Sequence, residues 1–290
     1  MAMQMLTAYW RLFRPAQWLK NVIVFAPLFF GHHFADVPRL IATTVAFIAF
    51  CLCASAVYCI NDALDAPRDA LHPVKRHRPV AAGVITPRQS VAAGVVTCVI
   101  ALVCAFLVSG TLAGVLALYI ALNLFYSVKA KHMAMIDILI LAVFYILRLF
   151  AGEVASGIEL SHWIIIVTFT GSIMLACGKR REELIANAGK ETRKSLDGYN
   201  VAFLNAAMTV AASATFICYV MYSIDEHVVA VVGRLCYLTS FFVLGGILQY
   251  VRLVLVFGYG DNPVKMIISD RVIIGCVVCW IGVLAFLIYG

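Results

Sequence analysis

Charged residues are scarce in this chain of 290 residues, and that scarcity decides its class. Asp, Glu, Lys and Arg make up only 13% of the residues, whereas 63% are hydrophobic and the mean hydropathy is +0.97. Soluble domains carry about 25% charged residues, so the composition excludes a soluble globular fold. It instead predicts a polytopic membrane protein.

Long polar segments are also missing, which leaves no room for a soluble domain beside the membrane part. We therefore expect residues 1–290 to form a single all-α transmembrane domain, because an apolar run of about 20 residues spans a bilayer as a helix. The apolar runs predict nine helices, near 18–34, 40–60, 90–109, 111–127, 134–152, 162–178, 201–223, 228–257 and 272–289.

The cysteines lack the arrangement of a metal site in a soluble connection. All ten lie in or beside apolar runs, and the two close pairs, Cys51/Cys53 and Cys276/Cys279, fall within predicted spans. We interpret them as buried, unreactive thiols.

Lys and Arg are distributed unevenly along the chain, and this predicts its orientation. The N-terminus and the connections between runs 2–3, 4–5, 6–7 and 8–9 hold 19 of the 22 Lys and Arg residues, counting Arg252 near the end of the eighth run. By the positive-inside rule these segments face the cytoplasm from a plasma (inner) membrane that the chain crosses many times. The net charge of +7 then reflects topology and phosphate binding, and no nucleic-acid partner is expected.

The densest polar stretch follows the second apolar run directly. It begins with Asn61 and places Asp62, Asp65 and Asp69 at spacings that share one face of a helix. Three like charges on one face repel unless a cation lies among them, and Mg²⁺ suits them because substrate phosphate completes its shell. Pro67 leaves open whether the helix ends there, so that Asp69 reaches the ion from a turn. The alternative is a solvated polar loop between two spans.

Basic and other polar side chains recur in the cytoplasmic connections, where they suit a substrate that carries phosphate groups. Asp137 is included because an ionisable residue inside an apolar run is a functional candidate, whereas Arg148 is interpreted as structural and paired with Glu153. The candidate substrate-binding residues are Arg14, Lys20, Lys75, Arg76, Arg78, Tyr126, Lys129, Asp137, Lys179, Arg180, Glu182, Glu183, Arg193 and Lys194. Asp261 and Lys265 are additional candidates in a turn after the eighth run.

Two of these assignments have structural alternatives. Arg14 and Lys20 suit either the cytoplasmic mouth or a role as snorkelling anchors at the membrane surface. Lys179 lies three and four residues before Glu182 and Glu183, so some of these charges can pair on a helix surface.

The position of the polar groups indicates an enzyme. A secondary transporter places its charges near the bilayer midplane on broken helices, and a pore spreads them along its axis. Here they gather at the cytoplasmic side of an apolar body, which predicts a cavity that opens to the cytoplasm and joins a water-soluble phosphate ester to a lipid. A lipid flippase or transporter without chemistry is the alternative from another class.

The acidic motif, Asn61-Asp62 with Asp65 and Asp69, and the basic run that follows at Lys75 resemble the UbiA-type intramembrane prenyltransferase superfamily. The resemblance covers nearly the whole chain. It implies a Mg²⁺-dependent transferase in which the three aspartates hold the ion and Asn61 orients them.

One departure from the family pattern concerns the substrate. Typical members carry a second acidic motif in the connection between the sixth and seventh helices, where this chain reads GKRREEL and then TRKSL. Together with RPAQWLKN near the start and YSVKAKH in the 4–5 connection, this resembles the phosphoribosyl-transferring branch of the superfamily. That branch implies phosphoribosyl pyrophosphate as donor, a decaprenyl-like polyprenyl phosphate as acceptor, and a product for lipid-linked arabinose in cell-envelope synthesis.

We assign the following roles to the candidate residues as a hypothesis. Lys75, Arg76 and Arg78, joined by Tyr126 and Lys129, would bind the donor phosphates. Glu182 or Glu183 would touch ribose hydroxyls. The 5-phosphate or the lipid phosphate would be bound by Lys179, Arg180, Arg193 and Lys194.

An alternative within the same superfamily moves a prenyl group from a prenyl diphosphate to an aromatic acceptor such as 4-hydroxybenzoate. It requires a second acidic cluster, and Glu182 and Glu183 among four cations form a poor one. Membrane lipids are expected partners in either case, and homo-oligomerisation stays open.

The predicted orientation can be tested by cysteine accessibility. On a background without the native cysteines, a single cysteine at position 190, in the 6–7 connection, should react with a membrane-impermeant maleimide only after the membrane is opened. Labelling of position 190 in intact cells would contradict the orientation.

Overall fold

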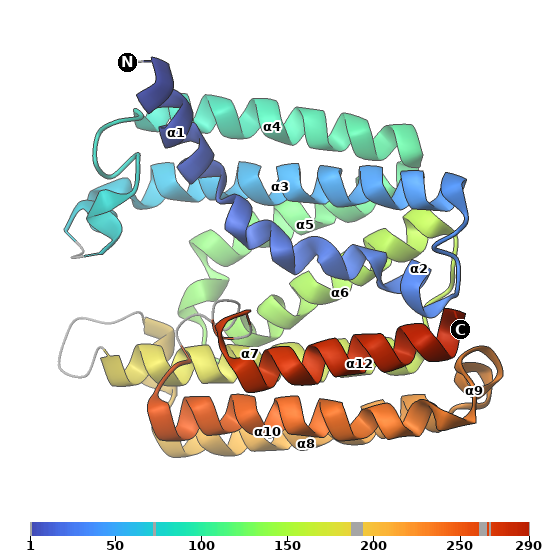
Figure 1. Cartoon of the computed structure of the whole chain (residues 1–290). Coiled ribbons are helices and arrows are strands. Elements are labelled where there is room, and N and C mark those ends of the chain that lie inside the picture. Colours follow the sequence, from blue (N-terminus) through green and yellow to red (C-terminus); the bar gives the residue numbers. More distant parts are fainter. Residues whose placement is uncertain (1, 72–73, 187–193, 261–265, 267, 290) are drawn as a thin grey trace. The chain divides into compact units, whose positions relative to one another are not determined.

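The chain folds into two compact helical units. The computed structural model describes residues 2–71, 74–186, 194–260, 266 and 268–289, and within these residues every regular element is a helix (Figure 1). The first unit comprises residues 1–29, 33–127 and 147–158, and the second comprises residues 30–32, 128–146 and 159–290. Helix α6 (Ile136–Ser156) contributes its first half to the second unit and its second half to the first.

Helix α3 (Val37–Ala70) is the longest element of the first unit. It begins at the N-cap Asp36, whose carboxylate accepts a hydrogen bond from the Arg39 backbone N–H at 3.2 Å. Its 34 residues extend over about 51 Å, whereas the hydrocarbon core of a bilayer is about 30 Å thick. The polar last turns therefore project beyond the apolar part. The helix continues through Pro67, so Asp69 lies on the helix and not in a turn.

Helix α4 (Pro87–Val108) lies alongside α3 (Figure 1). Its start is fixed by a capping box, in which Thr86 Oγ1 accepts from the Gln89 N–H and the Gln89 side chain accepts from the Thr86 N–H. The Ser90 hydroxyl donates to the Cys59 carbonyl at 2.8 Å. A Cβ at Gly94 would lie 3.1 Å from the Ala56 carbonyl oxygen, so glycine permits the close approach of the two helices.

The remaining elements of the first unit are α1 (Ala2–Phe13), the 3₁₀-helix η1 (Pro15–Phe25), most of α2 (Ala26–Phe30), the 3₁₀ turn η2 (Lys75–His77) and α5 (Gly110–Val128). Three of them, α1, η1 and η2, contact α3. Leu12 of α1 is buried against Cys59 and Ala66 of α3 and against Val80 and Ile85, which follow η2. The start of the chain therefore packs on the end of α3 that carries the aspartates.

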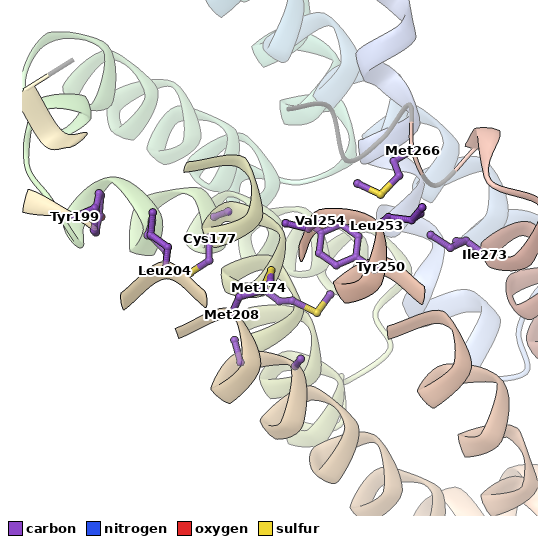
Figure 2. Close-up of a cluster of buried hydrophobic side chains, with 14 of the residues drawn as sticks. Met174, Cys177, Tyr199, Leu204, Met208, Tyr250, Leu253, Val254, Met266 and Ile273 are labelled. Atoms are coloured by element: carbon purple, nitrogen blue, oxygen red, sulfur yellow. The ribbon is translucent and has the colours of Figure 1, made fainter. Parts of the chain in front are cut away.

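The second unit is built on α7 (His162–Ala186) and α8 (Val201–Ile224), which pack against each other, and on α10 (Ser240–Phe257), which packs on α8 and α12. Figure 2 shows its apolar core, to which α7 contributes Met174 and Cys177 and α8 contributes Leu204 and Met208. The other elements are η3 (Ala130–His132), η4 (Lys194–Gly198), α9 (Glu226–Val232), η5 (Arg234–Thr239) and α12 (Arg271–Tyr289).

Eight helices in the described part of the chain are long and apolar enough to span a membrane. They correspond to the second through ninth predicted runs. The first run instead forms η1 and the short α2, and the count of nine stays a prediction. Proline explains the difference in part: Pro27 has no N–H to bond the Ile23 carbonyl, which accepts from Ala26 in a 3₁₀ pattern.

The run predicted as one helix over 228–257 is interrupted, and that prediction is wrong in detail. Gly233 adopts φ 98°, a conformation that glycine reaches readily, and it separates α9 from η5. The span therefore begins after this break, over Arg234–Phe257.

The contact of α6 with η1 offers a test of packing in the first unit. Gly152 is buried on α6, and a Cβ there would overlap the Val24 carbonyl group and lie 3.1 Å from Pro27 Cδ. Backbone atoms cannot yield as a flexible side chain can, so Gly152→Ala should destabilise the protein by about 1–3 kcal/mol. Thermal unfolding of the detergent-solubilised protein measures this.

Gly114→Ala is the matched control, because a Cβ at Gly114 on α5 meets nothing within 4 Å. That variant should be as stable as the wild type or slightly more stable, since alanine favours helix. Equal unfolding temperatures for both variants would show that the α6–η1 contact is looser than the structure indicates.

Candidate functional site

Three aspartates project from the last turns of α3 in the first unit. Asp62, Asp65 and Asp69 follow one another at three and four residues, the spacing of neighbours on one helix face. Asp62 is only 2% exposed and Asp69 only 5%, whereas Asp65 is half-buried. Burial of this degree makes an ionised carboxylate costly unless a cation lies against it.

Two arginines supply that charge. Arg14 donates to Asp62, and the Arg78 Nη1 atom donates to Asp69 Oδ2 at 2.5 Å and also lies 3.4 Å from Asp62 Oδ1. A single nitrogen of Arg78 is therefore shared by the two buried carboxylates. Both guanidinium groups are partly exposed, with 26% of the Arg14 side chain and 29% of the Arg78 side chain accessible to solvent.

Local structure holds Arg14 in place. It lies between α1 and η1 with φ 51° and ψ 57°, a left-handed conformation that residues other than glycine rarely adopt, and Pro15 follows it. Ser55 of α3 donates to the Phe13 carbonyl at 2.9 Å and accepts from the Trp18 indole at 3.0 Å. The guanidinium carbon lies 4.7 Å from the centre of the Tyr58 ring. The junction is thus tied to α3 on both sides of Arg14.

Asp62, Asp65 and Asp69, with Asn61, Arg14 and Arg78, form a first charged cluster. Its oxygen-bearing side chains fit a bound divalent cation. Asn61 Oδ1 is buried without a hydrogen-bond partner and lies on the same helical turn as Asp62. Asp62 and Asp69 already converge on one cationic nitrogen. Carboxylate and amide oxygens are the ligands that Mg²⁺ prefers. Among the described residues no three His, Cys, Asp or Glu side chains are gathered closely enough to form a metal group, and Arg78 contacts both Asp62 and Asp69.

The other candidate residues of the first unit are more exposed than Asp62 and Asp69. Lys75 and Arg76 are exposed on η2, and Arg76 Nε lies 3.4 Å from His77 Nε2. Lys20 on η1 and Tyr126 near the end of α5 are partly buried. The structure brings Arg14 and Arg78 together with Asp62 and Asp69.

A second charged cluster, in the second unit, is more deeply buried. Asp137 in the first turn of α6 has no exposed surface, and Arg180 of α7, 1% exposed, donates from Nε to its Oδ2 atom at 2.6 Å. Arg180 also pairs with Glu183 one turn further on. A buried pair of this kind fixes the start of α6 against α7.

Tyr199 completes this network. Its hydroxyl donates to Asp137 Oδ1 at 2.7 Å and accepts from the Met135 N–H at 2.5 Å. Burial, and then the hydrogen bond to Asp137, raise the pKa of the Tyr199 phenol, so it stays neutral and remains a donor at physiological pH. Met135 itself has φ 65°. Sequence reasoning missed Tyr199, which lies 62 positions from Asp137 in no recognisable motif.

Most charges at the end of α7 are used within the second unit. Arg181 pairs with Glu182 at 2.5 Å, donates to the Asn205 side chain at 2.8 Å, and donates to the Val254 carbonyl at 3.0 Å. Lys179 is the most exposed of the three basic residues, with 43% of its side chain accessible, and lies 3.9 Å from Glu183. The expected pairing of charges on this helix is confirmed.

Several further candidates have different surroundings. Lys129 is exposed at the start of the second unit. Arg148 is buried in the first unit, where it donates to Asn21 at 2.7 Å and lies over the Phe50 and Tyr119 rings. Arg193, Asp261, Lys265 and the side chain of Lys194 lie outside the described residues.

Comparison with known proteins gives this geometry a context. The model of the UbiA prenyltransferase family matches residues 22–257. The decaprenyl-phosphate phosphoribosyltransferase of Mycolicibacterium smegmatis is 34% identical, with 95% of this chain and 91% of the relative covered. The protein of that name from Corynebacterium glutamicum is 36% identical, with 95% and 85% covered.

Solved structures agree at the level of the fold. A UbiA homolog from Archaeoglobus fulgidus, bound to GPP and Mg²⁺, superposes with a TM-score of 0.72 over 98% of this chain and 100% of its own, at 16% sequence identity. The family model spans most of the chain and two relatives share more than 30% identity over nearly all of it, so the chain belongs to the UbiA prenyltransferase family.

Proposed function

We propose that this protein transfers a 5-phosphoribosyl group from phosphoribosyl pyrophosphate to a polyprenyl phosphate. The observation that carries the proposal is the similarity, over 95% of the chain, to two decaprenyl-phosphate phosphoribosyltransferases. The product would be a lipid-linked phosphoribose, which serves as a precursor for lipid-linked arabinose in the cell envelope. We place the reaction at the cytoplasmic side of the inner membrane, because the basic connections that carry both clusters are assigned there.

The first cluster would receive the pyrophosphate end of the donor. Asp62, Asp65 and Asp69 would hold Mg²⁺, with Asn61 orienting them. When bound, the ion would neutralise charge on the pyrophosphate leaving group. Arg14 and Arg78 are close enough to this position to contact the same pyrophosphate, and Lys75 and Arg76 supply exposed charge nearby in the chain.

The bond changes need little acid–base chemistry from the protein. The bond between ribose C1 and the pyrophosphate oxygen breaks, and a bond forms between C1 and an oxygen of the polyprenyl phosphate. Departure of pyrophosphate leaves an oxocarbenium-like ribose, as in other glycosyl transfers. The attacking oxygen is already anionic, so no general base is required. The residues contribute by positioning the reactants and stabilising charge.

The second cluster divides into residues that bind substrate and two residues that position the end of α7. Lys179 is exposed enough to reach a phosphate, and with Lys129, Arg193 and Lys194 it would hold the 5-phosphate or the lipid phosphate. Arg180 is buried in ion pairs with Asp137 and Glu183. We therefore assign Arg180 and Asp137 the role of positioning the end of α7. Glu182 or Glu183 would contact the ribose hydroxyls.

The test of the function is a transfer assay. Purified protein with Mg²⁺ is incubated with radiolabelled phosphoribosyl pyrophosphate and decaprenyl phosphate, and the lipid is extracted. Label should appear in the organic phase with wild-type protein. It should fall at least ~10-fold with Asp62→Asn, because loss of even an outer-shell partner of a metal ligand typically costs 10- to 100-fold in affinity or activity.

The same protein should be offered a prenyl diphosphate together with 4-hydroxybenzoate. Prenylation of the aromatic acid, with no label transferred from phosphoribosyl pyrophosphate, would contradict the proposal. Movement of lipid across the bilayer without any new bond would instead favour a transporter.

The positioning role of Arg180 gives a separate prediction. Arg180→Gln leaves Asp137 buried without its cation, which should reduce the free energy of unfolding by about 3–5 kcal/mol. Lys179→Gln is the matched control, since its exposed pair with Glu183 contributes at most about 1 kcal/mol. Thermal unfolding in detergent compares the two. Adding Asp137→Asn to Arg180→Gln should recover part of the loss, because both charges are then removed.

Kinetics would distinguish the two roles. If Arg180 contacted a substrate phosphate directly, Arg180→Gln would raise the donor or acceptor KM at an unchanged unfolding temperature. That result would remove Arg180 from its positioning role and leave the proposed reaction intact.

A further inference from the structure

The two arginines of the first cluster are held differently. Arg14 is fixed by its left-handed backbone, by the following Pro15, and by its contact with the Tyr58 ring. Arg78 follows η2 with an extended backbone, and its contacts in the cluster are the two hydrogen bonds from Nη1. Its guanidinium can therefore leave the carboxylates by side-chain rotation, without a change in the helices.

The position of Arg78 also coincides with the place for a shared cation. Its Nη1 atom contacts Asp62 Oδ1 and Asp69 Oδ2, the two most buried carboxylates of the motif. A divalent ion shared by the same two oxygens would take the position of this nitrogen. Two cations cannot occupy it together, because they repel each other and compete for the same lone pairs.

We propose that Arg78 is an exchangeable resident cation that closes the carboxylate cluster to metal until a diphosphate is present. In the resting protein Arg78 neutralises Asp62 and Asp69. When a diphosphate arrives, the guanidinium turns to it, since Arg binds phosphate oxygens through paired charge-assisted hydrogen bonds. The vacated carboxylates then receive the ion. The chemical identity of the diphosphate rests on the proposed function, whereas the exchange itself rests on the contacts of Arg78.

This exchange couples the two ligands thermodynamically. Metal alone must displace Arg78 into solvent, so it binds weakly, and metal with diphosphate binds more tightly because the displaced guanidinium gains a new partner. By linkage, the metal must strengthen diphosphate binding by the same factor. The protein would thereby avoid holding a bare divalent ion at its carboxylates between turnovers.

The test measures metal binding without any donor. Mn²⁺ serves as the spectroscopic substitute for Mg²⁺, and the free ion is followed by electron paramagnetic resonance in purified protein. Arg78→Gln should bind Mn²⁺ at least ~10-fold more tightly than the wild type, because the resident charge is gone. Arg68→Gln is the matched control: Arg68 is exposed on α3, the helix that carries the aspartates, and its replacement removes the same charge. It should change Mn²⁺ affinity by less than ~3-fold.

A second measurement tests the coupling. Retention of radiolabelled inorganic pyrophosphate on immobilised protein should rise at least ~10-fold when Mn²⁺ is added to the wild type. With Arg78→Gln this rise should shrink to less than ~3-fold. Arg78→Lys, which keeps the charge but lacks the second nitrogen, should bind Mn²⁺ with intermediate affinity, and it serves in place of Arg78→Gln if that variant does not fold.

Unchanged or weaker Mn²⁺ binding by Arg78→Gln, or Arg78→Lys where it replaces that variant, would overturn the exchange. The outcome is separable from the proposed function. If wild-type protein transfers phosphoribosyl to lipid while Arg78→Gln shows no gain in Mn²⁺ affinity, the exchange fails and the function stands. If Mn²⁺ affinity rises as expected but no label reaches the lipid, the function fails and the exchange stands for another diphosphate.

Discussion

Buried charge in an apolar chain must be paired, and this constraint shapes both charged clusters. Asp62 and Asp69 lie on a helix of 34 residues whose last turns project past the apolar span, yet both carboxylates are still buried. An isolated carboxylate in that environment would be protonated or would destabilise the fold. The fold therefore brings Arg14 and Arg78 to α3, and the packing of α1 and the segment after η2 on α3 follows from that requirement as much as from hydrophobic contact.

The same constraint has a different outcome in the second unit. Arg180 is 1% exposed and bonds Asp137, which in turn accepts from Tyr199, so each of these three side chains has a partner inside the protein. Such a closed network rigidifies the ends of the helices that it joins. Arg78, by contrast, has 29% of its side chain exposed and shares one nitrogen between two acceptors. Exposure thus separates an arginine that can change partners from one that cannot.

Sequence predicted the membrane class, the location of eight spans and the acidic motif, because apolar periodicity and charge position are local properties. It missed what depends on backbone geometry or long-range contact. The first apolar run contains Pro27, and its 3₁₀ geometry does not follow from hydropathy. The break at Gly233 was hidden because one glycine within an apolar run is ordinarily tolerated. The contact of Tyr199 with Asp137 joins residues 62 positions apart, and no single-chain pattern marks it.

The basic sequence at the end of α7 shows that the number of Lys and Arg residues in a segment overstates how many of them are available to bind phosphate. In the sequence, Lys179, Arg180 and Arg181 place three cations in a row. In the fold, Arg180 forms ion pairs with Asp137 and Glu183. Arg181 pairs with Glu182 and donates to a backbone carbonyl near the end of α10. Of the three, Lys179 has the most solvent-exposed side chain. The departure from the family pattern is therefore structural as well as electrostatic: it fastens α6, α7 and α10 together. The proposed donor must then depend on similarity to the phosphoribosyltransferases over 95% of the chain, and not on the number of positive charges in one connection.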